Sequence, residues 1–210
     1  MKFRFHYKKL LKIIYIRLIF NLKNQYILSD NMIEVEVKAK INSFEEIEQK
    51  LSQIGAVKTK KEFQEDIYFN SPVVDFAKTD EALRIRTTKE DEKTNIFITY
   101  KGPKIDKKSK TRKEIEMGIA DSKQCSDIFE SIGFKKVRTV RKNRQYYTYK
   151  NFEISLDDIE GLDPYMEIEI ALEDGQDYSD AQNKIFKLFE QIGITDGFER
   201  TSYLELLENL

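Results

Sequence analysis

The sequence predicts an α+β fold in which eight antiparallel strands form a closed or nearly closed β-barrel, with amphipathic helices packed outside it. Segments that alternate apolar and charged residues, as half-buried strands do, recur from residue 33 to residue 170. Most of them are neighbours in the sequence, which favours antiparallel pairing over strand-helix-strand units. The amphipathic helices need an apolar sheet face to cover, and a barrel removes the exposed edges of the sheet.

Three of the predicted strands carry Glu-x-Glu among apolar residues, at 33–38, 113–117 and 166–170. Each is followed by a helix and an Ile-Gly pair. Side chains alternate between the two faces of a strand, so both glutamates of each copy share one face. Further strands are predicted at 63–69, 82–88, 95–101, 111–117, 139–149 and 152–157.

Helices are predicted at 43–55, 121–133, 179–193 and 203–207. The first begins at Ser43, where Glu46 completes a capping box, and Gly55 is its natural end. The third begins at Ser179, with Gln182 in the equivalent place. The apolar stripe of the second helix consists of Cys125, Ile128, Phe129 and Ile132.

Composition limits the chemistry that this chain can perform. Its 210 residues suit a single domain, and 36 basic against 37 acidic residues give no global attraction to nucleic acid. A lone cysteine excludes an internal disulfide, and Cys125 is expected to be a buried thiol of a reduced, cytoplasmic protein. The lone histidine, His6, lies in an N-terminal tail, so a catalytic mechanism must do without one.

Residues 1–31 differ from the rest of the chain because basic residues surround an apolar run from Leu10 to Phe20. This run is shorter than the roughly 20 residues of a membrane-spanning helix, so stable membrane insertion is not expected. A disordered or artefactual extension is favoured, since Met32 directly precedes the first strand. A basic amphipathic surface helix is the alternative. The folded domain is predicted over residues 32–210.

The predicted strands, one after another, have one aliphatic face and one face that carries many positively and negatively charged side chains. For a single strand, a solvent-facing sheet with cross-strand salt bridges would explain the pattern. Because the helices need the aliphatic faces, however, the ionised faces are expected to point into the barrel. Clustered carboxylates suit divalent cations, and clustered arginine and lysine suit phosphate oxygens. A bound metal ion would pair with the carboxylates, and a bound polyphosphate would pair with the arginine and lysine side chains.

An ordered series of motifs carries a family resemblance. It runs Glu34-x-Glu36-x-Lys38, Asp66-x-Tyr68-Phe69, Leu83-Arg84-Ile85-Arg86, Tyr100-Lys101-Gly102-Pro103, Arg112-x-Glu114-x-Glu116, Lys142-x-Arg144, Leu156-Asp157 and Glu167-x-Glu169. The series resembles the CYTH, or triphosphate tunnel metalloenzyme, superfamily over residues 32–210. The Tyr-Lys-Gly-Pro stretch and the ending at 200–207 are most similar to the class IV adenylate cyclase branch.

The resemblance implies an eight-stranded tunnel that binds a triphosphate with Mg²⁺ or Mn²⁺ in a two-metal site. The implied metal ligands are Glu34, Glu36, Asp157, Glu167 and Glu169. The triphosphate oxygens would be held by Lys38, Arg84, Arg86, Lys101, Arg112, Lys142 and Arg144, with Arg200 near the tunnel mouth. Of these cations, Lys38, Lys101 and Arg144 are expected to act in catalysis. Glu114 and Glu116 would orient the metal ions without binding them directly.

The function implied by this branch is conversion of ATP to cyclic AMP and pyrophosphate. A triphosphatase acting on tripolyphosphate, thiamine triphosphate or a nucleotide is the first alternative, and a non-catalytic polyphosphate-binding or nucleotide-binding module is the second. The sequence contains no Walker loop, Rossmann glycine fingerprint or HExxH motif. The expected partner is therefore a small triphosphate rather than nucleic acid, and the resemblance leaves a homodimer open.

Overall fold

The computed structural model describes residues 32–103, 112–173 and 178–210. The basic extension predicted over 1–31, including His6, lies outside these residues. None of the helices in the described ranges has the length and apolar character needed to cross a membrane.

Nine strands form one antiparallel sheet in the order β5-β4-β3-β2-β6-β7-β8-β1-β9. The strands are β1 (Met32–Lys40), β2 (Val57–Asn70), β3 (Ala82–Glu90), β4 (Lys93–Lys101), β5 (Glu114–Gly118), β6 (Lys135–Tyr149), β7 (Phe152–Ile159), β8 (Tyr165–Glu173) and β9 (Phe198–Glu199). The helices are α2 (Phe44–Gln53), α3 (Phe76–Thr79), α4 (Ser122–Ser131), α5 (Tyr178–Gln191) and α6 (Tyr203–Glu208).

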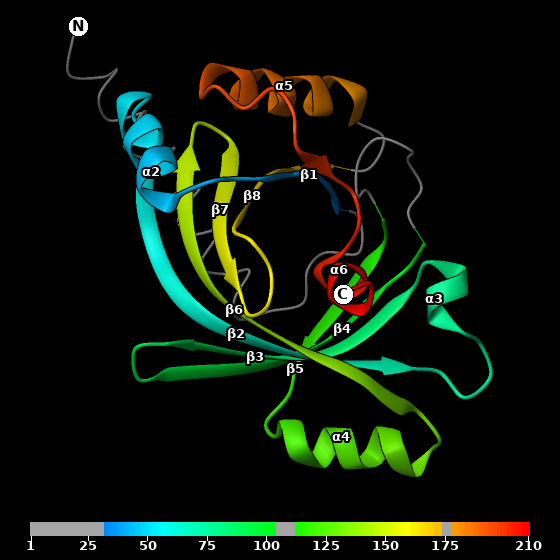
Figure 1. Cartoon of the computed structure of the whole chain (residues 1–210). Coiled ribbons are helices and arrows are strands. Elements are labelled where there is room, and N and C mark those ends of the chain that lie inside the picture. The colour runs from blue at the N-terminus through cyan, green and yellow to red at the C-terminus, as the bar shows by residue number, and fades with distance from the viewer. Residues whose placement is uncertain (1–31, 104–111, 174–177) are drawn as a thin grey trace, which may run out of the picture. The chain divides into compact units, whose positions relative to one another are not determined.

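The antiparallel architecture is confirmed, but the sheet is open and the barrel is therefore approximate. Strands β5 and β9 end the sheet in the described part of the chain. The ninth strand is the two-residue β9, which pairs with Lys38 and Ala39 of β1. The long central strands β2 and β6 curve, so that β1, β7 and β8 lie across from β3 and β4 (Figure 1). Register shifts between Lys58 and Lys60, and between Ile67 and Phe69, accompany this curvature.

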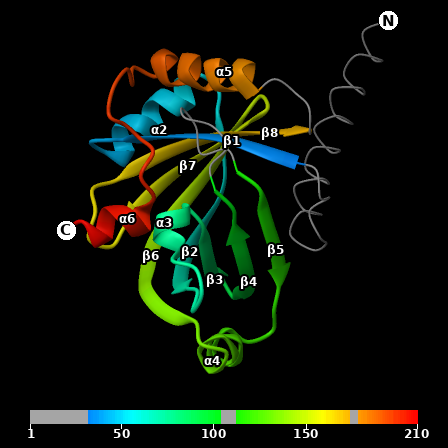
Figure 2. The same cartoon turned by 90° about the vertical axis from the view of Figure 1, so that its right-hand side faces the viewer.

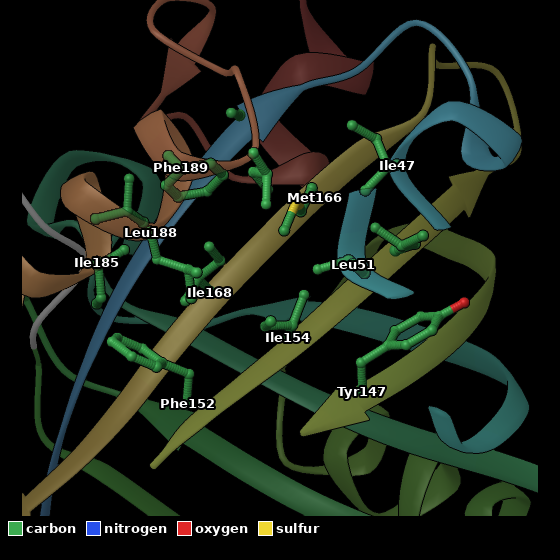
Figure 3. Packing of buried hydrophobic residues seen from close by; sticks show 14 of the residues in the cluster. Ile47, Leu51, Tyr147, Phe152, Ile154, Met166, Ile168, Ile185, Leu188 and Phe189 are labelled. Atoms are coloured by element: carbon green, nitrogen blue, oxygen red, sulfur yellow. The ribbon is translucent and has the colours of Figure 1, made fainter. Parts of the chain in front are cut away.

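The largest hydrophobic core lies between the sheet and two helices. Side chains of β1, β7 and β8 that face outward pack against α2 and α5 (Figures 2 and 3). Leu51 of α2, Ile154 of β7 and Ile168 of β8 are fully buried there. A second cluster lies under α4, where the ring of Phe129 meets that of Phe69 edge to face, with centroids 5.2 Å apart. The helices thus cover the aliphatic side of the sheet, as predicted.

Helix ends follow the predicted capping chemistry in part: the Ser43 hydroxyl caps α2, but the Glu46 carboxylate pairs with Lys50, and α5 begins at Tyr178, so that Ser179 lies inside the helix rather than before it. The Ser43 hydroxyl accepts a hydrogen bond from the Glu46 backbone N–H at 3.2 Å, and Asp121 accepts one from Gln124 at 2.9 Å. Gly55 follows α2 with φ +82°, a conformation that residues with a Cβ rarely adopt. A complete capping box starts α6, where Ser202 and Glu205 each accept a backbone N–H of the other.

The sequence did not predict α3 or β9, both of which are short, and it placed the start of β2 at residue 63 rather than 57. The predicted buried stripe of α4 is partly wrong. Ile128 and Ile132 are 59% and 61% exposed, because the Phe129 side of α4 faces the sheet. Cys125 lies at the edge of this contact and is half-buried rather than buried. Periodicity shows that a helix is amphipathic, but the packing decides how wide its buried stripe is.

Leu51→Ala should lower the free energy of unfolding by about 2 to 5 kcal/mol, because it leaves a cavity between α2 and the sheet. Ile128→Ala on the exposed side of α4 is the matched control and should change it by less than about 0.5 kcal/mol. Urea unfolding followed by circular dichroism measures both. Equal losses in the two variants would contradict this placement of the core.

Candidate functional site

The face of the sheet opposite the α2 and α5 core carries charged side chains in register across neighbouring strands. In β1, Glu34, Glu36 and Lys38 alternate with Val35 and Val37, which belong to the core. The pairing of β1, β8 and β7 places Glu36, Glu169 and Glu153 in one row across the three strands. The next row contains Lys38, Glu167 and Ser155. This inner face combines the groups that the motif series predicted would share a face.

Four half-buried carboxylates gather at one end of this face: Glu34, Glu36, Glu153 and Glu169. Burial, followed by the charges of Glu34, Glu153 and Glu36, raises the pKa of Glu169 well above its ordinary value. Such crowding is relieved by a proton or by a cation, and oxygen donors of this type suit Mg²⁺ or Mn²⁺. The donor chemistry therefore fits a divalent ion. In the described ranges, however, no three Asp, Glu, Cys or His side chains are already arranged around a metal position.

A second group is centred on Asp157 of β7, which is fully buried. Its carboxylate accepts hydrogen bonds from Lys142 at 2.9 Å and from Arg144 Nε at 2.6 Å. Tyr203 of α6 donates a third at 2.9 Å, and Arg144 also contacts Glu167. Burial would raise the pKa of Asp157, but Arg144 and Lys142 hold it below its ordinary value. Asp157 and Glu167 are thus both paired with the Arg144 cation.

Lys142 belongs to this group, and its pKa is lower than that of an ordinary lysine. Burial and the neighbouring Arg144 charge lower its pKa to about 8, against the opposing effects of Asp157 and Glu167. A fraction of Lys142 is therefore a neutral amine near neutral pH.

A third group joins β2 to β3. Arg86 donates to both oxygens of Asp66, with Nε–Oδ1 at 2.6 Å and Nη2–Oδ2 at 2.7 Å. Arg84 donates to the same carboxylate at 3.3 Å. Burial would raise the pKa of Asp66, but the two guanidinium groups hold it far below its ordinary value of 3.8. Asp66 thereby keeps two arginines together on the inner face.

The predicted residues of β4 and β5 lie at one end of the sheet order. Glu114 forms an ion pair with Lys101, and Glu116 accepts a hydrogen bond from Thr99 at 2.8 Å. Arg112 precedes β5 and donates weakly to the Gly102 carbonyl at 3.5 Å. Glu114 and Glu116 therefore contact groups of β4, at the opposite end of the strand order from Glu34 and Glu36.

The C-terminal segment covers part of the inner face. Lys38 donates to the Thr201 carbonyl, and its ammonium lies 4.1 Å from the centre of the Tyr203 ring. Lys142 lies 4.9 Å from the same ring. Arg200 precedes α6 and is exposed, one residue from the carbonyl that Lys38 binds. Segments that are distant in sequence, β1 and α6, are joined by Lys38.

Sequence reasoning did not select several residues that the structure brings into these groups. They are Glu62, Gln64, Asp66 and Tyr203. Asp66 belongs to a motif of the series, and period-two alternation with Glu62 and Gln64 could have placed it on the inner face. Tyr203 lies in the 200–207 segment that resembles the class IV branch, but local alternation could not predict its contact with Asp157, which depends on how α6 packs.

Asp66→Asn should lower the free energy of unfolding by about 3 kcal/mol near pH 7, because Arg84 and Arg86 would remain close together without their carboxylate. The folded pKa of Asp66 is depressed, so its stabilisation is complete above the unfolded pKa and is lost as pH falls toward the folded one. The difference between wild type and variant should therefore be smaller near pH 3. Urea unfolding at both pH values measures it.

Asp163→Asn is the control, since Asp163 forms an exposed ion pair with Lys40 that should contribute less than about 1 kcal/mol. A pH-independent effect of Asp66→Asn would show that the ionised carboxylate is not the source of the stabilisation.

Comparison with known proteins adds a family match to this geometry. The sequence model of the CYTH domain matches residues 32–203. "Putative adenylate cyclase MJ0240" of Methanocaldococcus jannaschii is 46% identical over 176 residues, which are 83% of this chain and 98% of that protein. The PH1819 structure from Pyrococcus horikoshii is similar with a TM-score of 0.79 and 42% identity, covering 84% and 98% of the two chains. HpAC1 from Hippeastrum, described as having a dominant triphosphatase activity, shares the fold with a TM-score of 0.61 at 17% identity, covering 85% and 95%.

Proposed function

The chain belongs to the CYTH domain family, and from that premise we propose that it is a divalent-metal-dependent adenylate cyclase that converts ATP to cyclic AMP and pyrophosphate. The relative from Methanocaldococcus jannaschii and the "Adenylate cyclase CyaB" of Aeromonas hydrophila carry names that support this activity. One structural observation carries the proposal. Crowded carboxylates and buried cations lie side by side on the same sheet face.

Glu34, Glu36 and Glu169, joined by Glu153, would hold the metal ions. Asp157 and Glu167 complete the set implied by the motifs, and in this structure Arg144 pairs with both. A bound Mg²⁺ or Mn²⁺ would supply Lewis acidity that lowers the pKa of the attacking ribose hydroxyl and stabilises the leaving pyrophosphate.

The cations of the inner face would bind and orient the triphosphate. Arg86 of β3 is held by Asp66 of β2, and its remaining N–H groups would be available to phosphate oxygens; Lys142 and Arg144 lie on β6, on the other side of β2. Lys38 adds a charge from β1, beside the carboxylates. Positioning and charge stabilisation of this kind provide most of the rate enhancement in phosphoryl transfer.

A triphosphatase is the second candidate function. It is supported by the fold shared with HpAC1, for which a dominant triphosphatase activity is described. The same charged face would bind the substrate, but water rather than the ribose hydroxyl would attack, and at the terminal phosphorus.

The purified full chain, supplied with Mg²⁺ or Mn²⁺, should convert ATP to cyclic AMP and pyrophosphate, and a chelator should stop the reaction. Chromatography of the products from ATP and, separately, from inorganic tripolyphosphate tests this. Orthophosphate from tripolyphosphate without cyclic AMP from ATP would assign the triphosphatase function instead. Turnover that persists in the chelator would exclude the metal-dependent mechanism.

Glu169→Gln should reduce kcat/KM by about 100-fold or more, because it replaces one of the carboxylates that would bind the metal with an amide that cannot ionise. Steady-state kinetics over a range of Mg²⁺ concentrations measures the loss. Glu160→Gln, at an exposed position near Arg141, is the matched control and should keep wild-type activity. Near-normal turnover in Glu169→Gln would remove this carboxylate from the metal site.

Arg86→Lys should raise KM by about tenfold, because lysine keeps the charge but cannot donate to both oxygens of Asp66 and to a phosphate oxygen in the fixed geometry of a guanidinium. Arg141→Lys is its control, since Arg141 also pairs with a carboxylate, Glu65, but on the exposed surface. Initial rates at varied ATP concentrations give both constants. An unchanged KM for Arg86→Lys would exclude Arg86 from phosphate binding.

A further inference from the structure

A buried cluster on β2 and β6 adjoins the proposed phosphate-binding cations. Those cations donate hydrogen bonds, whereas this cluster offers a hydrogen-bond acceptor. It consists of Glu62 and Gln64 of β2 with Tyr146 of β6, strands that lie side by side (Figure 1). Glu62 is opposite Arg144 in the strand register, and Gln64 is opposite Lys142. The two β2 side chains are 6% and 1% exposed.

The hydrogen bonds of this cluster fix the orientation of the Gln64 amide. Its Nε2 donates to Glu62 Oε1 at 2.5 Å and to the Tyr146 hydroxyl at 2.9 Å, while that hydroxyl donates to Glu62 at 2.7 Å. Turning the amide over would place its oxygen against the Glu62 carboxylate, which is unfavourable. Gln64 Oε1 is consequently a buried acceptor with no hydrogen-bond partner among the described residues.

Glu62 reinforces this acceptor character. Burial would raise its pKa, but Lys60, with Nζ 2.9 Å from Glu62 Oε2, and the hydrogen bonds from Gln64 and Tyr146 hold it below the ordinary value. One cluster therefore contains an ionised carboxylate and an amide oxygen that has no partner in the described part of the chain. Phosphate oxygens are acceptors too and would be repelled here, whereas an O–H or N–H group would be bound.

We propose that Gln64, supported by Glu62, binds a hydrogen-bond donor on the nucleoside part of the substrate and so selects nucleoside triphosphates over inorganic tripolyphosphate. This inference rests on the proposed function, because it assumes that the adjacent arginines and lysines hold the triphosphate. Ribose hydroxyls and the adenine amino group are the donors that ATP offers, and inorganic tripolyphosphate has neither. Gln64 is then a specificity-determining residue that touches the substrate away from the reacting phosphorus.

Calorimetric titration of the full chain with Mg²⁺ tests the proposal. The ligands are analogues of ATP and of tripolyphosphate whose bridging oxygens are replaced by methylene groups, so that neither can be turned over at those bonds. Gln64→Leu should weaken binding of the ATP analogue by about tenfold and that of the tripolyphosphate analogue by less than about twofold. Gln145→Leu is the matched control, because Gln145 lies on the outward face of β6 near Tyr147 and should change neither affinity.

Two further ligands identify the donor. If a ribose hydroxyl is bound, the 2′-deoxy or 3′-deoxy form of the ATP analogue should bind wild type and Gln64→Leu equally. If the adenine amino group is bound, the form of the ATP analogue that lacks this group should bind wild type and Gln64→Leu equally. If Gln64→Leu does not unfold in a cooperative thermal transition, Glu62→Gln is tested in its place. Glu62→Gln should show the same selective loss of affinity for the ATP analogue.

The outcomes separate this inference from the proposed function. Equal weakening of both ligands, or no weakening of either, would overturn the role of Gln64 while leaving triphosphate binding intact. Wild-type binding of the tripolyphosphate analogue alone would overturn nucleoside recognition and favour the triphosphatase function. Binding of neither ligand by wild type would overturn the proposed function, and this inference with it.

Discussion

The structure depends on burying ionised groups of both signs on one face of a β-sheet. An unpaired charge in such surroundings costs several kcal/mol, so each buried charge needs an opposite partner or a bound ion. Asp157 satisfies this requirement by holding Lys142 and Arg144, and Asp66 does so by holding Arg84 and Arg86. Each of these two carboxylates contacts two cations on the inner face, and Glu167 is a further partner of Arg144.

The arrangement of the helices follows from the same constraint. With the ionised side chains turned inward, the aliphatic side of the sheet faces outward, and α2, α4 and α5 cover it. Helix α6 is different because it packs on residues of the charged side, where Tyr203 contacts Asp157 and lies beside Lys38 and Lys142. The C-terminal segment is therefore part of the site's surroundings as well as part of the fold.

The charges of the inner face are not evenly balanced. Arginine and lysine side chains are held by Asp66 and Asp157, whereas Glu34, Glu36, Glu153 and Glu169 crowd together until the pKa of Glu169 rises. That crowding is the feature that a divalent cation would relieve, and a triphosphate would in turn add negative charge near the cations. Gln64 and Glu62 form a third environment, suited to a neutral donor. An acid-rich, a base-rich and an acceptor-rich region lie on one face, and in the proposed substrate complex they would bind the metal, the phosphates and the nucleoside.

The sequence by itself determined the strands, most helix ends, and the side chains that share a face, because period-two alternation and capping are local properties of the chain. It correctly placed Glu34 with Glu36 and Lys142 with Arg144 on common faces. Only the tertiary structure decided that the sheet is open, that Ile128 is exposed, that Asp66 pairs with Arg86, and that Tyr203 reaches Asp157. The physical reason is that cross-strand register and helix packing join residues far apart in the chain, and local alternation does not specify which strand lies beside which.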